Sequence, residues 1–152
     1  MARDITKLTQ VAKEIETYYN IPCRVLEADL SSPDCASRIY AATSEAGLKV
    51  DILINNAGVC TQGEMIEGDI DSTMNMLQVN VGSVVQLSHL YGKDMKDRRV
   101  RRFAAFVVTP LLDALTALAV FFQRGRMLFV SSMVGALPSC PTVAVYAGEY
   151  SF

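Results

Sequence analysis

The chain has 152 residues, is 51% hydrophobic and carries a formal net charge of −2. This length accommodates at most one domain, and the apolar content is sufficient for a globular core. The weak negative charge gives no electrostatic reason to expect a nucleic-acid partner.

The first third of the sequence predicts a helix, a strand and a second helix. Apolar residues recur at helical spacing over residues 4–18, and Asn20–Pro22 ends that pattern. Residues 24–29 are typical of a short strand. Ser32–Asp34 is a helix start, because proline is tolerated early in a helix and an acid there interacts favourably with the helix dipole. The helix that follows is expected to run to about Gly47.

The remaining predicted elements complete an alternation of helices and strands. Residues 50–55 form a short apolar run with branched side chains, too short for a helix. Helical patterning resumes near Ser72 and continues to about Met95, with an interruption predicted at residues 79–82. Residues 126–131 form another apolar strand. This order is typical of an α/β fold with a parallel sheet.

Two asparagines and a glycine follow the strand at residues 50–55, and the rest of the chain is organised around this point. An unbroken apolar run is typical of a strand that helices bury on both faces. Ligands of open α/β sheets bind beyond the carboxyl ends of the strands. Gly58 allows the backbone to turn close to such a ligand. We therefore expect the binding site here.

Three short motifs stand in order along the chain. The first is Asn-Asn-Ala-Gly at Asn55, Asn56, Ala57 and Gly58, and Val130–Ser132 and Val145–Ala147 follow it. In type and at nearly the same spacing, these motifs resemble those of the short-chain dehydrogenase/reductase family. The resemblance extends from Met1 to about Arg99 and resumes over residues 124–147. It implies a Rossmann-like three-layer α/β sandwich and an NAD(P)-dependent oxidoreductase acting on a secondary alcohol or ketone.

The resemblance also implies which residues would carry the chemistry. In the family, a tyrosine phenol exchanges a proton with the substrate oxygen while a hydride passes to or from the nicotinamide. Tyr146 matches this acid/base, Ser132 matches the serine that orients the substrate oxygen, and Asn80 matches the asparagine that supports a relay water. Ser131 is a weaker candidate for the serine. Tyr150 occupies the position of the family's lysine, whose charge lowers the pKa of the phenol.

The cofactor site is only partly present in the sequence. The resemblance assigns Asp29 and Leu30 to the adenine end of the dinucleotide, and it assigns the Asn55–Gly58 motif to cofactor binding. Arg3 lies where a basic residue often receives the 2′-phosphate of NADP, so we expect NADP, with NAD as the alternative. A solvated charge at a helix start is the other interpretation of Arg3. The sequence contains no G-x-x-x-G-x-G, the loop that offers a helix N-terminus to the pyrophosphate.

The strand order of the family, 3-2-1-4-5-6-7, indicates that the sheet is incomplete. Residues 24–29, 50–55 and 126–131 correspond to strands 3, 4 and 5, so strands 1 and 2 have no counterpart. Unpaired backbone groups cost about 1–3 kcal/mol each when they are kept from water. We therefore expect residues 1–152 to be a partial NAD(P)-binding Rossmann domain that is catalytically inactive on its own.

Residues 100–123 interrupt the resemblance and have three interpretations. The segment begins with valine, whose codon starts GT, and Phe121–Gln123 can be encoded as a pyrimidine tract followed by CAG, as in a translated intron. Alternatively, the apolar residues 103–122 form a membrane-associated helix, although Pro110 and Asp113 disfavour a spanning one. The third interpretation is a long soluble helix that packs on the domain.

The end of the chain extends the intron interpretation. Gly148–Tyr150 can encode a splice-donor sequence at the place where the family's lysine is expected. The alternative function is then a non-catalytic truncated protein that associates with membranes or with full-length relatives through exposed sheet edges.

The remaining expectations concern partners and location. Four scattered cysteines show no metal-ligand spacing, so we expect no metal site and a reducing compartment. No apolar stretch follows residues 1–4, so we expect no signal peptide and no secretion. The protein is predicted to be cytoplasmic or associated with the endoplasmic-reticulum membrane. Its partner would be a small-molecule alcohol or ketone, and a homo-oligomer is compatible with this interpretation.

Overall fold

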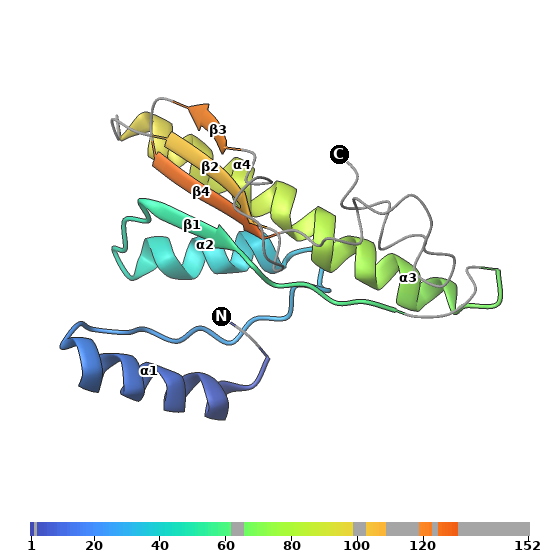
Figure 1. Ribbon diagram of the computed structural model, residues 1–152, viewed down its shortest axis with the longest axis horizontal. Helices are drawn as coiled ribbons and strands as arrows, with labels where there is room; N and C mark the ends of the chain where they lie inside the picture. Colours follow the sequence, from blue (N-terminus) through green and yellow to red (C-terminus); the bar gives the residue numbers. More distant parts are fainter. Residues whose placement is uncertain (2, 62–65, 99–102, 109–118, 123–124, 131–152) are drawn as a thin grey trace.

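Figure 1 shows a computed structural model of the chain, in which helices and a partly parallel sheet are combined as in an α/β fold. The structure describes residues 1, 3–61, 66–98, 103–108, 119–122 and 125–130. In chain order the elements are α1 (Ile5–Tyr19), α2 (Cys35–Glu45), β1 (Ile52–Asn55), α3 (Ile70–Leu77), the π-helical turn η1 (Gln78–Gly82), α4 (Ser83–Asp97), β2 (Phe103–Val108), β3 (Ala119–Phe122) and β4 (Gly125–Val130).

The first predicted helix is confirmed as α1, and local polar groups fix both of its ends. The Asp4 carboxylate accepts a hydrogen bond from the backbone N–H of Lys7 at 3.0 Å, which is an N-cap. At the other end Asn20 has a left-handed backbone with φ 52° and donates its N–H to the carbonyl of Glu16 at 3.0 Å. Ala12 is the one buried residue of α1, so this helix is only lightly packed.

The sheet has the strand order β1-β4-β2-β3. β1 and β4 are parallel neighbours, with Ile52 opposite Arg126 and Asn55 opposite Phe129. β4 is also parallel to β2, while β3 runs antiparallel to β2. The predicted strands at residues 50–55 and 126–131 are therefore confirmed as adjacent strands of a parallel pair.

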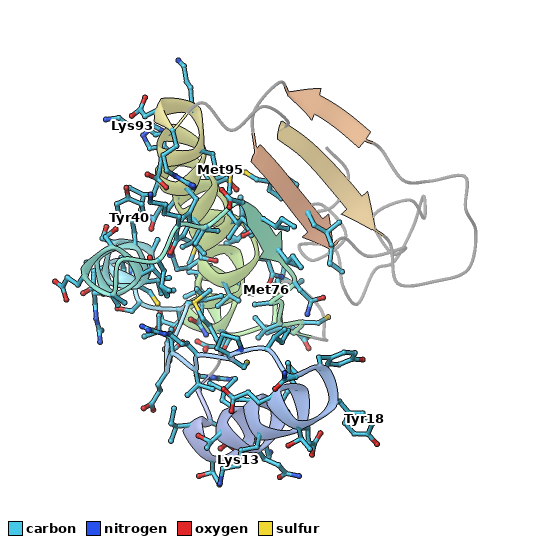
Figure 2. All side chains as sticks on the ribbon, turned by 90° about the vertical axis from the view of Figure 1, so that its left-hand side faces the viewer. Lys13, Tyr18, Tyr40, Met76, Lys93 and Met95 are labelled. Atoms are coloured by element: carbon cyan, nitrogen blue, oxygen red, sulfur yellow. The ribbon has the colours of Figure 1, made fainter. Side chains whose placement is uncertain are left out.

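Helices α2 and α4 lie on the same side of β1 and β4, as Figure 2 shows. The core of the described fold fills the space between these helices and the two strands. Its buried members are Cys35, Ala36, Ile39, Leu53, Leu87, Tyr91, Met95 and Met127.

β1 is buried on one face only, which corrects the expectation of a strand covered on both faces. Leu53 and Asn55 are 5% and 8% exposed, whereas Ile52 and Ile54 are 55% and 56% exposed. Successive side chains of a strand point to opposite faces, and α2 and α4 cover only one of them. The described helices therefore leave the other face of β1 half exposed.

Residues 24–29 do not form the predicted strand. Glu27 makes a single-residue bridge, and the described sheet contains no strand from this segment. A strand persists only where a neighbour pairs its backbone N–H and C=O groups, and an apolar sequence does not supply that neighbour. The prediction failed because it relied on local sequence alone.

The helical interpretations of residues 103–122 are wrong for the described part of that segment, because β2 and β3 are strands. Branched and aromatic residues make up most of both runs and favour strands, and β4 provides a partner for β2. Throughout the described ranges, none of the helices has the length and apolar character needed to cross a bilayer. The origin of residues 100–123 as an insertion stays a prediction.

The long predicted helix is interrupted by η1, which separates α3 from α4. Asp69 caps α3 by accepting a hydrogen bond from the N–H of Ser72 at 3.0 Å. Within η1 the Gln78 side chain lies against Gly82, so that a Cβ added to this glycine would be 2.5 Å from Gln78 Oε1. A side chain at position 82 would therefore force the end of the Gln78 side chain to move. Turns of this kind recur at functional sites, and this one contains Asn80.

Candidate cofactor site

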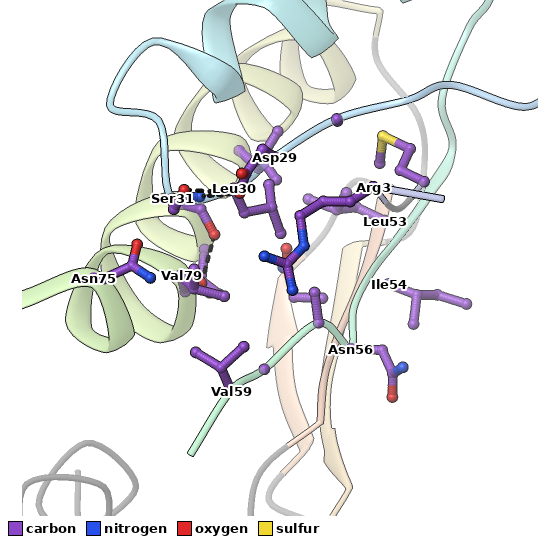
Figure 3. A pocket seen from close by; sticks show the side chains of 18 residues that line it. Arg3, Asp29, Leu30, Ser31, Leu53, Ile54, Asn56, Val59, Asn75 and Val79 are labelled. Atoms are coloured by element: carbon purple, nitrogen blue, oxygen red, sulfur yellow. Dashed lines mark hydrogen bonds between the residues drawn. The ribbon is translucent and has the colours of Figure 1, made fainter. Parts of the chain in front are cut away.

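A cavity of about 510 Å³ opens at the carboxyl end of β1. Residues 28–31 form one wall, and residues 53–59 form the other (Figure 3). Side chains of η1 and α4, including Val79 and Leu87, complete the lining. The cavity brings together the seven residues that the resemblance assigned to the cofactor, namely Arg3, Asp29, Leu30, Asn55, Asn56, Ala57 and Gly58.

Asp29 is held at the rim of the cavity by a local turn. Its Oδ1 atom accepts hydrogen bonds from the Ser31 backbone N–H at 3.0 Å and from the Ser31 hydroxyl at 2.8 Å. These bonds, and more weakly the charge of Arg3, lower the pKa of the Asp29 carboxyl below its ordinary value. Asp29 therefore stays ionised. A carboxylate of this kind accepts hydrogen bonds, so it suits a ligand donor such as an amino group.

Arg3 places a positive charge in this cavity. Figure 3 shows its side chain extending from the chain terminus into the space bounded by Leu30 and Asn56. A guanidinium presents five N–H donors in a planar fork, a geometry that matches phosphate oxygens. Because α1 begins at Ile5 and is capped by Asp4, Arg3 precedes that helix rather than lying within its first turn.

Asn80 does not line the cavity, but it holds the loop that does. Its Oδ1 atom accepts a hydrogen bond from the Val59 N–H at 2.9 Å, and its Nδ2 group donates to the Val59 carbonyl at 2.8 Å. Asn80 is 8% exposed, so both bonds lie away from bulk solvent. One side chain thus satisfies both backbone polar groups of Val59 and fixes the loop after Gly58 to η1.

The two asparagines at the end of β1 have different surroundings. Asn55 is buried and donates from Nδ2 to the Ser88 hydroxyl of α4 at 3.3 Å, which ties the strand end to the helix. Asn56 is exposed at the cavity. Asn55 therefore ties the strand end to α4 while it lines the cavity, and Asn56 is the more exposed of the two.

Comparison with known proteins identifies the family. The sequence matches the model of the short chain dehydrogenases over residues 1–109. The chain belongs to this family. It is 32% identical over 138 residues to very-long-chain 3-oxoacyl-CoA reductase-B of Danio rerio, a match that covers 82% of this chain and 44% of the relative. L-xylulose reductase of Hypocrea jecorina (strain QM6a) is 25% identical, a match that covers 89% of this chain and 45% of the relative. The chain thus spans less than half the length of these curated relatives.

Solved structures agree on the short-chain dehydrogenase fold. A 7β-hydroxysteroid dehydrogenase superposes with a TM-score of 0.77 and 24% identity, covering 99% of this chain and 48% of that one. A short-chain dehydrogenase from Sphingobium yanoikuyae in complex with NADPH has a TM-score of 0.72 and 18% identity. The match covers 99% of this chain and 48% of that one. At these identities the likeness establishes the Rossmann-like fold.

Sequence reasoning missed several residues of this short-chain dehydrogenase site. Ser31 orients Asp29, and the two-residue spacing after an aspartate is the turn signal that would have found it. Ser88 and Val59 hold their asparagine partners through contacts across 33 and 21 residues, which no local pattern reveals. Asn75 of α3 also lines the cavity.

Two of the three predicted catalytic residues lie outside the described part of the chain. Tyr146 and Ser132, together with the weaker candidate Ser131, fall within residues 131–152, so their positions stay predictions. In the portion that the structure describes, no group of three or more histidine, cysteine, aspartate or glutamate residues is placed to hold a metal ion.

Proposed function

We propose that this chain is a portion of an NAD(P)-dependent oxidoreductase that acts on a secondary alcohol or ketone. The observation that carries the proposal is the gathering of Asp29, Leu30 and the Asn55–Gly58 motif around one cavity at the end of a parallel strand. The relatives named very-long-chain 3-oxoacyl-CoA reductases favour a ketone on a long acyl chain as the substrate.

The proposed chemistry divides proton transfer and orientation among three side chains. The bound dinucleotide supplies the hydride. Tyr146 gives its phenol proton to the substrate oxygen during reduction, and Ser132 donates a hydrogen bond that holds this oxygen in place. Asn80 keeps the Val59 loop next to the site and supports the relay of protons.

NADP is the proposed cofactor, in preference to NAD. The 2′-phosphate of NADP needs a cation near the adenosine end, and Arg3 supplies one beside Asp29. The ionised Asp29 carboxylate would accept from the adenine amino group, with Leu30 as its apolar neighbour. Asn56, Ala57 and Gly58 would contact the adjoining part of the dinucleotide.

The 152-residue chain is expected not to catalyse the reaction by itself. Tyr150 stands at the lysine position and brings no charge that would lower the pKa of Tyr146. The sequence also holds no glycine loop whose backbone N–H groups would neutralise the pyrophosphate. Recognition of the adenosine end is therefore expected to be weak, and catalysis is expected to be absent.

Nuclear magnetic resonance of the purified chain tests this function. Adenosine 2′-monophosphate at millimolar concentration should shift the amides of residues 29–31 and 56–58 more than the 5′-monophosphate does. Arg3→Ala should remove that preference, whereas Lys13→Ala, a change to an exposed cation on α1, should leave it intact. If neither nucleotide shifts these amides, the cavity is not a nucleotide site and the proposal fails.

Fluorescence of NADPH tests the inactivity separately. We expect no saturable binding at micromolar concentrations and no oxidation of the cofactor in the presence of a 3-oxoacyl thioester. Saturable micromolar binding with turnover would contradict the inactivity but support the oxidoreductase assignment.

A second candidate function is non-catalytic. The exposed outer face of β1, with Ile52 and Ile54, favours association with full-length relatives or membranes, or a homo-oligomer. Such a chain would act in the cytoplasm or at the endoplasmic-reticulum membrane. Vesicle flotation of the chain with and without Val100–Gln123 tests the membrane branch, since membrane binding through this segment requires it.

A further inference from the structure

Asn75 is a polar residue of the cavity lining to which the proposed function gives no role. Two other polar side chains of the lining are committed within the chain. Asn55 donates to the Ser88 hydroxyl at 3.3 Å. The Ser83 hydroxyl donates to the Val79 carbonyl at 2.7 Å. The Asn75 carboxamide makes no hydrogen bond to another residue in the described part of the chain, so it is available to a ligand.

The position of Asn75 is fixed by its neighbours on the helix. Met76 is 1% exposed, and its sulfur accepts a hydrogen bond from the Thr61 hydroxyl at 3.5 Å. Asn75 precedes Val79 by about one helical turn. Both residues line the cavity, and Figure 3 shows them projecting from the same helical segment. Asn75 therefore adds a carboxamide to the cavity that residues 28–31 also line.

The helix itself gives no reason for asparagine at this position. Asn75 lies inside α3 and caps neither of its ends. Asparagine is a weaker helix former than alanine, because its side chain competes for backbone hydrogen bonds. The requirements of α3 therefore do not account for this residue, whereas a polar ligand in the cavity would.

Asp29 has one carboxylate oxygen left for such a ligand. Ser31 directs both of its hydrogen bonds to Oδ1, and none of the described residues donates to Oδ2. The 6-amino group of adenine carries two hydrogens, one on the side of N1 and one on the side of the acceptor N7. One carboxylate oxygen accepts one of these hydrogens. The other hydrogen and N7 together need a group that both accepts and donates.

We propose that Asn75 is a specificity-determining residue that recognises the edge of adenine formed by the 6-amino group and N7. Its Oδ1 atom accepts the amino hydrogen that Asp29 does not take, and its Nδ2 group donates to N7. Carboxamide side chains pair with adenine in this bidentate way when they recognise the base in DNA. The inference rests on the proposed function, because it needs the adenosine end of the dinucleotide to occupy this cavity.

The two side chains then select adenine by different atoms. A purine with an oxygen at position 6 would place an acceptor against the Asp29 carboxylate, which has no hydrogen to donate. Asn75 adds a requirement for N7 that Asp29 does not impose. An adenine analogue with carbon in place of N7, 7-deazaadenine, therefore loses the bond from Nδ2 and keeps the bond to Asp29.

The test compares adenosine 2′-monophosphate with its 7-deaza analogue in nuclear magnetic resonance titrations of the 152-residue chain. We expect the analogue to bind the unmodified chain about three- to tenfold more weakly, as the loss of one hydrogen bond predicts. Asn75→Ala should weaken binding of the parent nucleotide and make the two affinities equal. This variant keeps α3 folded, because alanine is the better helix former. Gln10→Ala removes an exposed carboxamide of α1 and is the matched control, which should keep the preference.

A second variant tests the same contact by charge. Asn75→Asp keeps an acceptor for the amino hydrogen but places negative charge opposite the lone pair of N7. The 7-deaza analogue should therefore bind this variant at least as well as the parent nucleotide does. A preference for the parent nucleotide in this variant would contradict a contact between position 75 and N7.

The results separate this inference from the proposed function. If both nucleotides shift the cavity amides and the unmodified chain binds them equally, the cavity takes adenosine but Asn75 does not recognise N7. The inference is equally overturned if the preference survives Asn75→Ala or is lost in Gln10→Ala. If neither nucleotide shifts the amides, the proposed function fails and this inference fails with it.

Discussion

Leu53 and Ile54 are neighbours on β1, yet they face two different environments. Leu53 is 5% exposed and belongs to the core that α2 and α4 build, while Ile54 on the other face is 56% exposed. Both faces of β1 carry branched apolar residues, Leu53 on one and Ile52 and Ile54 on the other. What differs is the presence of helices, so the burial of a strand face is decided by the elements that reach it.

The core side is closed by polar contacts as well as by apolar packing. Arg98 at the end of α4 donates to Asp51 at 2.7 Å and to Asp94 at 3.0 Å, and also reaches the carbonyl of Val50 before β1. The rings of Tyr40 and Tyr91 meet edge to face, with 5.3 Å between their centroids. This side is thus closed by packing and by polar contacts, whereas on the cavity side residues 24–29 form no strand and β1 has a described partner strand on one edge alone.

The largest effect on stability is expected when substitutions on the two faces of β1 are compared. Leu53→Ala removes core volume and is expected to lower the free energy of local opening by about 2–5 kcal/mol. Ile54→Ala, one residue along, should change it by no more than about 0.5 kcal/mol. Hydrogen exchange at the α4 amides measures both without assuming two-state unfolding. Equal losses would mean that the outer face is covered in solution, and the contrast would be lost.

A second test asks whether Asn80 of η1 fixes the loop at Val59 that lines the cavity. Asn80→Ala leaves both backbone groups of Val59 without their partner and should speed exchange of the Val59 amide, at a cost of about 1–3 kcal/mol. Asn80→Asp keeps an oxygen acceptor for the Val59 N–H but loses the donor, so its effect should be smaller. An unchanged Val59 amide in Asn80→Ala would show that η1 does not hold this loop.

Local signals in the sequence located the helices to within a few residues and pointed to residues that line the cavity. Asn20 ends α1 in a left-handed conformation that asparagine tolerates. The Asn55–Gly58 motif lines the cavity together with Asp29 and Arg3. The position of the motif follows from the rule that ligands of open α/β sheets bind beyond the carboxyl ends of the strands. These features depend on neighbouring residues or on the general rules of α/β sheets.

Several features that depend on distant partners were predicted wrongly, although the pairing of β1 with β4 was predicted correctly. Residues 24–29 have strand composition but no described partner strand, and residues 103–108 join β4 as a strand rather than forming a helix. Ile52 and Ile54 looked like core residues, although burial requires a covering element that their own sequence does not encode. Pairing and coverage are properties of the whole fold, so a short window of sequence does not determine them.

A smaller effect is expected from the hydrogen bond between the hydroxyls of Thr43 and Tyr91 in the core. The Thr43 hydroxyl donates to the Tyr40 carbonyl at 2.9 Å, so Tyr91 donates its phenol hydrogen to Thr43, with 2.7 Å between the oxygens. Tyr91→Phe removes one hydrogen bond and leaves Thr43 with its other partner. The expected cost is about 0.5–1.5 kcal/mol in the free energy of unfolding, measured by hydrogen exchange at α2 and α4.

The same substitution changes the response to alkaline pH. Burial raises the pKa of Tyr91 above its ordinary value. The folded state therefore holds this proton more tightly than the unfolded state. The stability that follows is complete below the ordinary tyrosine pKa and is lost as pH rises through the raised value. Tyr91→Phe should make the core less sensitive to pH in that range, and an unchanged alkaline profile would contradict this role.

The smallest effect concerns the rim of the cavity. Ser31→Ala removes one of two hydrogen bonds to Asp29 but keeps the backbone N–H, which is the larger cause of the lowered pKa. A carbon-detected titration should therefore show a partial rise of the Asp29 pKa. Ser32→Ala is the matched control, because the Ser32 hydroxyl donates to Asp34 and lowers that pKa instead.

The sign of the accompanying stability change follows from the lowered pKa of Asp29. A lowered folded-state pKa contributes stability that is present above the ordinary pKa and is lost as pH falls through the lowered value. Because Asp29 is exposed, this contribution is small, and Ser31→Ala should reduce it only slightly. The titration therefore probes the rim independently of the core. A full return of Asp29 to its ordinary pKa would mean that the turn opens without the serine, so that the cavity wall depends on one hydroxyl.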